Sequence, residues 1–138
     1  MRPYTFDIDP ANVDADGICQ SQTPLAGGSL IINGALTTGG AFDVLTTGGD
    51  SGGISGRKIA FVFAADETGR TFTITGTSPE GFAQTSTVAG TTPSTVEDTK
   101  YWKTISDISV DAATAGALTV GTVDEVITKL LPLNNRAH

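Results

Sequence analysis

Apolar and polar residues alternate one by one along much of the chain from Arg57 to Val123, which is the two-residue period of β-strands. Phe72 and Ile74, for example, are each set between threonines. Turn-forming glycine, proline and aspartate residues recur roughly every ten positions between these runs. The pattern predicts roughly eight to ten short antiparallel strands and a chain built mainly of sheet.

The most apolar run extends from Arg57 to Ala65. Ile59, Phe61 and Phe63 share one face of the expected strand, and the small or branched residues between them occupy the other face. A strand that is apolar on both faces is typical of the middle of a sheet or of a covered sheet. We therefore expect this strand to be central.

An irregularity interrupts the next apolar pattern, from Lys100 to Val110. Tyr101, Lys103 and Ile105 share one parity, whereas Ile108 and Val110 share the other. A shift of one residue near positions 106–107 restores a common face, and such a shift is the signature of a β-bulge.

Two further local signals lie outside the stretch from Arg57 to Val123. Asn33-Gly34 lies between two short apolar runs and favours a type I′ hairpin turn, because both residues tolerate positive φ. After Asp124 the apolar spacing becomes helical and Pro132 ends it; the residues in this short helical pattern are Val126, Ile127, Leu130 and Leu131.

These signals predict an all-β protein, an antiparallel β-sandwich, with a jelly roll as the first choice of topology. We divide the chain into an N-terminal arm (1–28), a sandwich domain (29–123) and a C-terminal tail (124–138). In the arm, Tyr4, Phe6 and Ile8 fall on one face of a short expected strand.

Composition narrows the function. The chain has 138 residues, which is enough for one domain with its own core. Its formal charge of −7 repels the phosphate backbone of nucleic acids, so we expect no nucleic-acid partner. No run approaches the length of a membrane span, and the N-terminus lacks the apolar stretch of a secretory signal. The single cysteine, Cys19, excludes an intrachain disulfide framework, and without a base beside it the thiol is expected to be inert.

The segment 49–53 reads Gly-Asp-Ser-Gly-Gly, as around the nucleophilic serine of chymotrypsin-like proteases. That chemistry also requires a histidine, in that family placed before the serine, and a buried carboxylate. His138, the last residue, is the only histidine in the sequence. We interpret the motif as turn composition and expect no enzyme, no catalytic residue and no cofactor.

Asp14 and Asp16, followed by Gly17, resemble the first half of an EF-hand calcium loop. Thr23 stands where such a loop needs a bidentate glutamate, and no helix signal flanks the segment. We interpret it as an acidic turn available to a partner's lysine or arginine, with weak calcium binding as the alternative. No metal site is predicted elsewhere.

Three segments carry a resemblance to a known family: 71–77 (TFTITGT), 100–105 (KYWKTI) and 113–121 (ATAGALTVG). The stretch from about Ser55 to Thr122, which contains them, resembles a recurrent module of small virion proteins of tailed bacteriophages. The whole chain, with its acidic arm and short tail, resembles the decoration, or cement, proteins on the heads of short-tailed phages. The resemblance implies a jelly-roll-like sandwich that pairs as a homodimer and bridges subunits of the major capsid protein. It implies a place on the outer surface of the capsid, after assembly in the host cytoplasm, and no catalytic residues.

Two function hypotheses follow. The first is a capsid decoration protein whose ends make the contacts, because an extended arm adds to a sheet edge and an apolar tail docks in a groove. The second is a tail- or fibre-associated module that binds a receptor or a glycan, for which an exposed Trp102 would serve. The alternation at Tyr101 and Trp102 predicts one ring in the core and the other at least partly exposed. The expected partner-binding residues are Tyr4, Phe6, Asp14, Asp16, Trp102, Ile127, Leu130 and Leu131.

Overall fold

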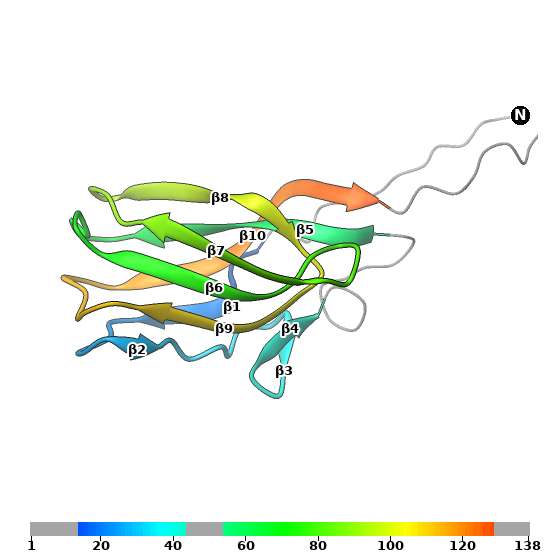
Figure 1. The fold of residues 1–138 in the computed structure, drawn as a ribbon. Helices are drawn as coiled ribbons and strands as arrows, with labels where there is room; N and C mark the ends of the chain where they lie inside the picture. The colour runs from blue at the N-terminus through cyan, green and yellow to red at the C-terminus, as the bar shows by residue number, and fades with distance from the viewer. Residues whose placement is uncertain (1–13, 44–53, 129–138) are drawn as a thin grey trace, which may run out of the picture.

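The computed structural model describes residues 14–43 and 54–128, which form two antiparallel sheets packed as a sandwich (Figure 1). The first sheet has the order β1 (Asp14–Gln22), β10 (Leu118–Thr128), β5 (Ile54–Phe63) and β8 (Ser94–Trp102). The second has the order β3 (Thr37–Thr38), β4 (Ala41–Asp43), β9 (Thr104–Val110), β6 (Thr71–Thr77) and β7 (Ala83–Ala89), and β2 (Gly28–Ser29) also pairs with β9. The prediction of an all-β antiparallel sandwich is confirmed.

Strand pairing is nested along the chain. β1 pairs with β10, β4 with β9, β5 with β8 and β6 with β7. The described chain therefore resembles one long hairpin that is closed by the β6–β7 turn and folded over into two layers (Figure 1). As a result, β10 ends and β5 begins at the same end of the sandwich, where Thr128 lies opposite Ile54.

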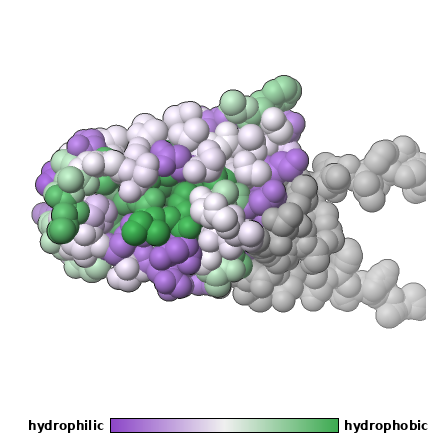
Figure 2. All heavy atoms as spheres, turned by 90° about the horizontal axis from the view of Figure 1, so that it is seen from below, coloured by the Kyte–Doolittle hydropathy of each residue, from purple (hydrophilic) through white to green (hydrophobic). Residues whose placement is uncertain are grey.

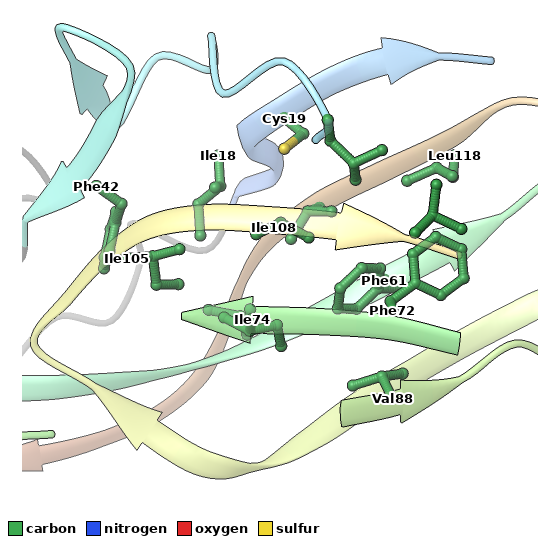
Figure 3. Packing of buried hydrophobic residues seen from close by; sticks show 14 of the residues in the cluster. Ile18, Cys19, Phe42, Phe61, Phe72, Ile74, Val88, Ile105, Ile108 and Leu118 are labelled. Carbon is green, nitrogen blue, oxygen red and sulfur yellow. The ribbon is translucent and has the colours of Figure 1, made fainter. Parts of the chain in front are cut away.

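The core lies between the two sheets and follows the predicted alternation. Ile59, Phe61 and Phe63 are buried, and β5 lies between β10 and β8, as expected of a central strand. The ring of Phe72, from the opposite sheet, lies beside that of Phe61 (Figure 3), with 5.1 Å between the centroids. The centroid of the Phe63 ring lies 5.3 Å from that of Phe72. Tilted pairs at this separation stabilise a core beyond the area they bury, so these rings join the layers.

The predicted bulge is confirmed in β9. Thr75 of β6 lies opposite Asp107, whereas the next residue, Gly76, lies opposite Ile105, so Ser106 is the extra residue. The bulge lets Ile105 and Ile108 both point into the core, despite their odd spacing. The strand expected over 100–110 is nevertheless divided, because the chain leaves the first sheet after Trp102 and enters the second at Thr104.

The hairpin predicted at Asn33-Gly34 is wrong. The tight turn lies at Gly39-Gly40, which joins β3 to β4 with φ values of 63° and 84°. Gly34 instead lies along β1, where its N–H donates to the carbonyl of Ile18 at 2.9 Å. A Cβ atom at position 34 would lie 2.2 Å from the backbone of Gly17, so this glycine permits a close approach of two chain segments.

The boundaries of the sheet domain differ from those expected. Residues 14–22, which we had assigned to the arm, form β1, whose Ile18 and Cys19 are fully buried. At the other end β10 continues to Thr128, so the helical prediction is wrong for residues 124–128. Residues 1–13, 44–53 and 129–138 lie outside the described residues.

Candidate functional site

Four loops meet at the end of the sandwich opposite to the end of β10 (Figure 1). Glu67, in the loop after β5, is 1% exposed, and its two carboxylate oxygens accept the N–H groups of Ala115 and Gly116, each at 2.9 Å. The backbone N–H of Glu67 donates to the carbonyl of Thr91 at 2.8 Å. In turn, the N–H of Thr114 donates to the carbonyl of Pro24 at 3.1 Å. The buried carboxylate thus ties the loop after β5 to residues 115–116, a structural role, and backbone hydrogen bonds join the other two loops to this pair.

A second buried carboxylate lies near the middle of the β7–β8 side. Oδ1 of Asp98 accepts a hydrogen bond from Ser86 Oγ, and Oδ2 accepts one from Trp102 Nε1, both at 2.7 Å. Three residues of β8, 98–100, lie opposite the single residue 59 of β5, and the buried Asp98 is the first residue of this bulge. Both oxygens of the carboxylate therefore have partners within the core.

Trp102 is fully buried, so the expectation that its ring contacts a partner is wrong. The prediction of one ring inside and one outside is confirmed, because the neighbouring Tyr101 is only half-buried. Its ring centroid lies 6.0 Å from Nζ of Lys58, which also pairs with Glu97 at 3.4 Å. Alternation identified the two faces correctly, but it could not show which of them faced the core.

Asp14 and Asp16 lie in strand β1 and not in a calcium-binding loop. The N–H of Asp16 donates to Oδ1 of Asp14 at 3.3 Å, and the hydrogen bond between the two side chains, followed by burial, raises the pKa of Asp14. Within residues 14–43 and 54–128, no three His, Cys, Asp or Glu side chains gather closely enough to hold a metal ion. The two carboxylates remain candidates for contact with a partner's cation.

Of the remaining residues that we expected to bind a partner, one lies in a described strand and the others lie outside the described residues. Ile127 lies in β10, where its backbone is opposite Gly56 of β5. Tyr4, Phe6, Leu130 and Leu131 lie outside the described residues, as does the Gly-Asp-Ser-Gly-Gly motif. Cys19 lies in the core beside Ile18 (Figure 3), where burial raises its thiol pKa to about 12. A thiol held in its protonated form is a poor nucleophile.

Sequence reasoning missed an apolar face formed by residues 22–31, which we call the 22–31 face. Leu25 and Ile31 are 89% and 63% exposed, and both line a shallow hollow of about 330 Å³. Figure 2 views the molecule from this side and shows apolar surface at its centre and at one end, bordered by hydrophilic residues. Contiguous exposed apolar surface, in contrast to singly scattered apolar residues, is typical of contact surfaces.

Side-chain hydrogen bonds hold the backbone of this face in place. The amide of Gln22, at the end of β1, accepts the N–H of Ile31 at 2.9 Å and donates to the carbonyl of the same residue at 2.9 Å. Gln22 thereby makes the two bonds that a neighbouring strand would make. Leu30 continues the pairing of β2, because its N–H donates to the carbonyl of Ile108 at 2.7 Å. The face is consequently ordered before any partner arrives.

A third exposed apolar residue, Phe82, lies at the opposite end of the sandwich and is 72% exposed. Its turn is rigid, because the N–H of Ser78 donates to the carbonyl of Phe82 at 2.8 Å and Gly81 adopts a φ of 93°. A Cβ atom at Gly56 would lie 2.5 Å from Pro79 of this turn, so the turn lies against the beginning of β5. Phe82 therefore belongs to the end at which β10 finishes.

The part of the chain that the structure describes contains no helix with the length and hydrophobicity needed to traverse a membrane. Comparisons with protein-family models, with curated proteins and with solved structures gave no significant match. The described residues thus present exposed apolar side chains at both ends of the sandwich, Leu25 and Ile31 on the 22–31 face and Phe82 at the opposite end.

Proposed function

We propose that this chain is a decoration protein that stabilises a phage capsid by bridging neighbouring subunits of the major capsid protein. The proposal starts from the resemblance of residues 55–122 to a module of small tailed-phage virion proteins and of the whole chain to decoration proteins. The described residues support it by their chemistry, because their buried carboxylates, Glu67 and Asp98, are occupied with structural hydrogen bonds. A rigid surface that binds a partner protein without catalysing a reaction suits a protein whose function is to hold other subunits together.

The strands next to the undescribed segments meet at one end of the sandwich, and this observation carries the proposal. β10 finishes at Thr128 opposite Ile54, and β4 finishes at Asp43 opposite Thr104 of β9. β1, the strand that follows residues 1–13, begins at Asp14 opposite Thr122 of β10 and runs away from this end (Figure 1). Arm and tail, the segments expected to contact the capsid, thus join the sandwich on the side that also carries Phe82.

The same proposal includes a jelly-roll topology. A jelly roll has eight strands in two sheets, arranged as two Greek keys. The nested pairs β1–β10, β4–β9, β5–β8 and β6–β7 support it, because folding one long hairpin of eight strands across two layers produces this pairing. In this interpretation β2 and β3 are additions to the connection between β1 and β4.

The proposed partners are the major capsid protein and a second copy of this chain, on the outer surface of the head. The net charge of −7 argues against nucleic acid, because binding to phosphate depends on lysine and arginine. The rival function, a receptor- or glycan-binding module of the tail or fibre, is weakened by the burial of Trp102, its expected aromatic platform.

The test is electron cryomicroscopy of phage heads with the full chain bound, compared with heads that lack it. Deletion of residues 1–12 or 129–138 is expected to abolish decoration while the isolated protein keeps its thermal unfolding midpoint. The second deletion begins at 129 because β10 continues to Thr128. Normal decoration by both truncated proteins would show that arm and tail are not the contacts. Density for the chain on tail fibres, and none on heads, would favour the rival function.

A further inference from the structure

We propose that the 22–31 face is the surface through which two copies of this chain pair. The inference deepens the proposed function and rests on it only for the setting, because pairing is a property of the isolated protein. It names a surface at the end of the sandwich opposite to the end from which residues 129–138 continue. One end of each copy can then bind the capsid while the other end contacts the second copy.

The first support is the apolar surface itself. Leu25 and Ile31 are two of the three large hydrophobic residues that are exposed among those the structure describes, and they line the same hollow. In a two-fold pair the same patch is used twice, so each Leu25 faces the hollow of the other copy. Aliphatic anchors that fill a pocket supply much of the binding energy in such contacts.

The second support is charge, and it is what favours another copy of this chain as the occupant. Each copy carries a formal charge of −7, so two copies repel one another overall. From Gly17 to Phe42 the sequence contains no Asp, Glu, Lys or Arg. Asp107, which borders the face, accepts a hydrogen bond from Ser29 Oγ at 2.7 Å. Like-charged copies meet with least repulsion across an uncharged face.

The third support concerns the kind of contact. The backbone N–H and C=O of Ile31 already bond to Gln22, and Leu30 bonds to Ile108. Residues 30 and 31 therefore do not offer these groups for adding a strand, and side chains must make the contact. The hydrogen bond from Thr114 to Pro24 fixes the turn that carries Leu25, so little conformational entropy is lost on pairing.

The experiment measures the mass of the full chain by sedimentation velocity, from low micromolar to millimolar concentration and without capsids. We expect a monomer–dimer equilibrium that tightens as salt is added, because salt screens the repulsion. The double variant Leu25→Asp with Ile31→Asp is expected to raise the dissociation constant by at least about a hundredfold, since two anchors are lost and four carboxylates oppose one another. The matched control is Phe82→Asp, which replaces an exposed apolar residue at the opposite end and is expected to leave the dissociation constant unchanged.

A wild-type chain that stays monomeric over the whole range overturns the proposal, as does a double variant that pairs like the wild type. A weaker dimer in Phe82→Asp alone assigns pairing to the other end and also overturns it. Circular dichroism checks that each variant folds, and the uncharged variant Leu25→Ser with Ile31→Thr repeats the test without added charge. Head binding is measured separately, so a failed dimer and a failed capsid interaction are distinguished.

Discussion

Nε1 of Trp102 donates to Oδ2 of Asp98 at 2.7 Å, four residues earlier in the same strand, and both side chains lie in the core. The contact spans the bulge of β8, and the second oxygen of Asp98 reaches Ser86 of β7. The pair therefore joins the edge strands of the two sheets on this side of the sandwich.

Replacing both residues in a double-mutant cycle should expose this coupling. Trp102→Phe leaves Asp98 with one donor fewer, and a buried acceptor without its partner costs about 1–3 kcal/mol. We expect the coupling energy between Trp102→Phe and Asp98→Ala to lie in the same range, measured by urea unfolding followed by circular dichroism. Additive effects of the two changes would show that the hydrogen bond contributes nothing to stability.

Glu67→Gln is expected to lower the free energy of unfolding by about 2 kcal/mol, the loss typical of hydrogen bonds to a charged group. The amide presents an NH₂ group to the N–H of Ala115 or Gly116, where the carboxylate presents an acceptor to each. Thermal or urea unfolding measures the change. The matched control, Glu80→Gln in the exposed turn after β6, should stay within about 0.5 kcal/mol of the wild type.

Asp66 should titrate below its ordinary range. Its Oδ1 accepts hydrogen bonds from the side chain and the backbone N–H of Thr68, and these, with the side-chain bond first, lower its pKa from 3.8. The turn is then stabilised above pH 3.8, and this stability is lost as the pH falls through the folded-state pKa. In an NMR titration Thr68→Val should move the pKa of Asp66 part of the way back. An unchanged pKa of Asp66 would show that the hydroxyl of Thr68 is not what lowers it.

Cys19 should resist thiol reagents while the protein is folded. Burial raises its pKa to about 12, so at about pH 8 almost none of the reactive thiolate is present, and the sulfur has no access to solvent. We expect no reaction with Ellman's reagent in native buffer and complete reaction in guanidinium chloride. Rapid labelling of the native protein would mean that β1 detaches from β10.

Much of the fold follows from local pattern. Alternation identified the buried face of β5, and the change of parity between Ile105 and Ile108 located the bulge at Ser106, because both signals depend on neighbours within one strand. Gly34 shows the limit of local reasoning. Asn-Gly favours a tight turn, yet glycine is needed at position 34 because the backbone there lies close to that of Gly17. Only the assembled sheet creates this contact.

The candidate surface was less predictable than the fold. Trp102 was expected at a surface because tryptophan is common in binding sites, and parity alone could not show that its ring faces inward. Leu25 and Ile31 were missed because isolated apolar residues in a loop carry no periodic signal. The absence of charge from Gly17 to Phe42 was visible in the sequence and is the signal that would have indicated this region.

The place of β10 has a consequence for how the protein is made. β10 is the last of the described strands along the chain, yet in its sheet it lies between β1 and β5. Until the ribosome has released this segment, the first sheet lacks an inner strand and β1 lacks the strand it pairs with in that sheet. The first sheet is therefore completed only after β10 has been made, and a chain cut short before Leu118 exposes the apolar residues of β5 to aggregation.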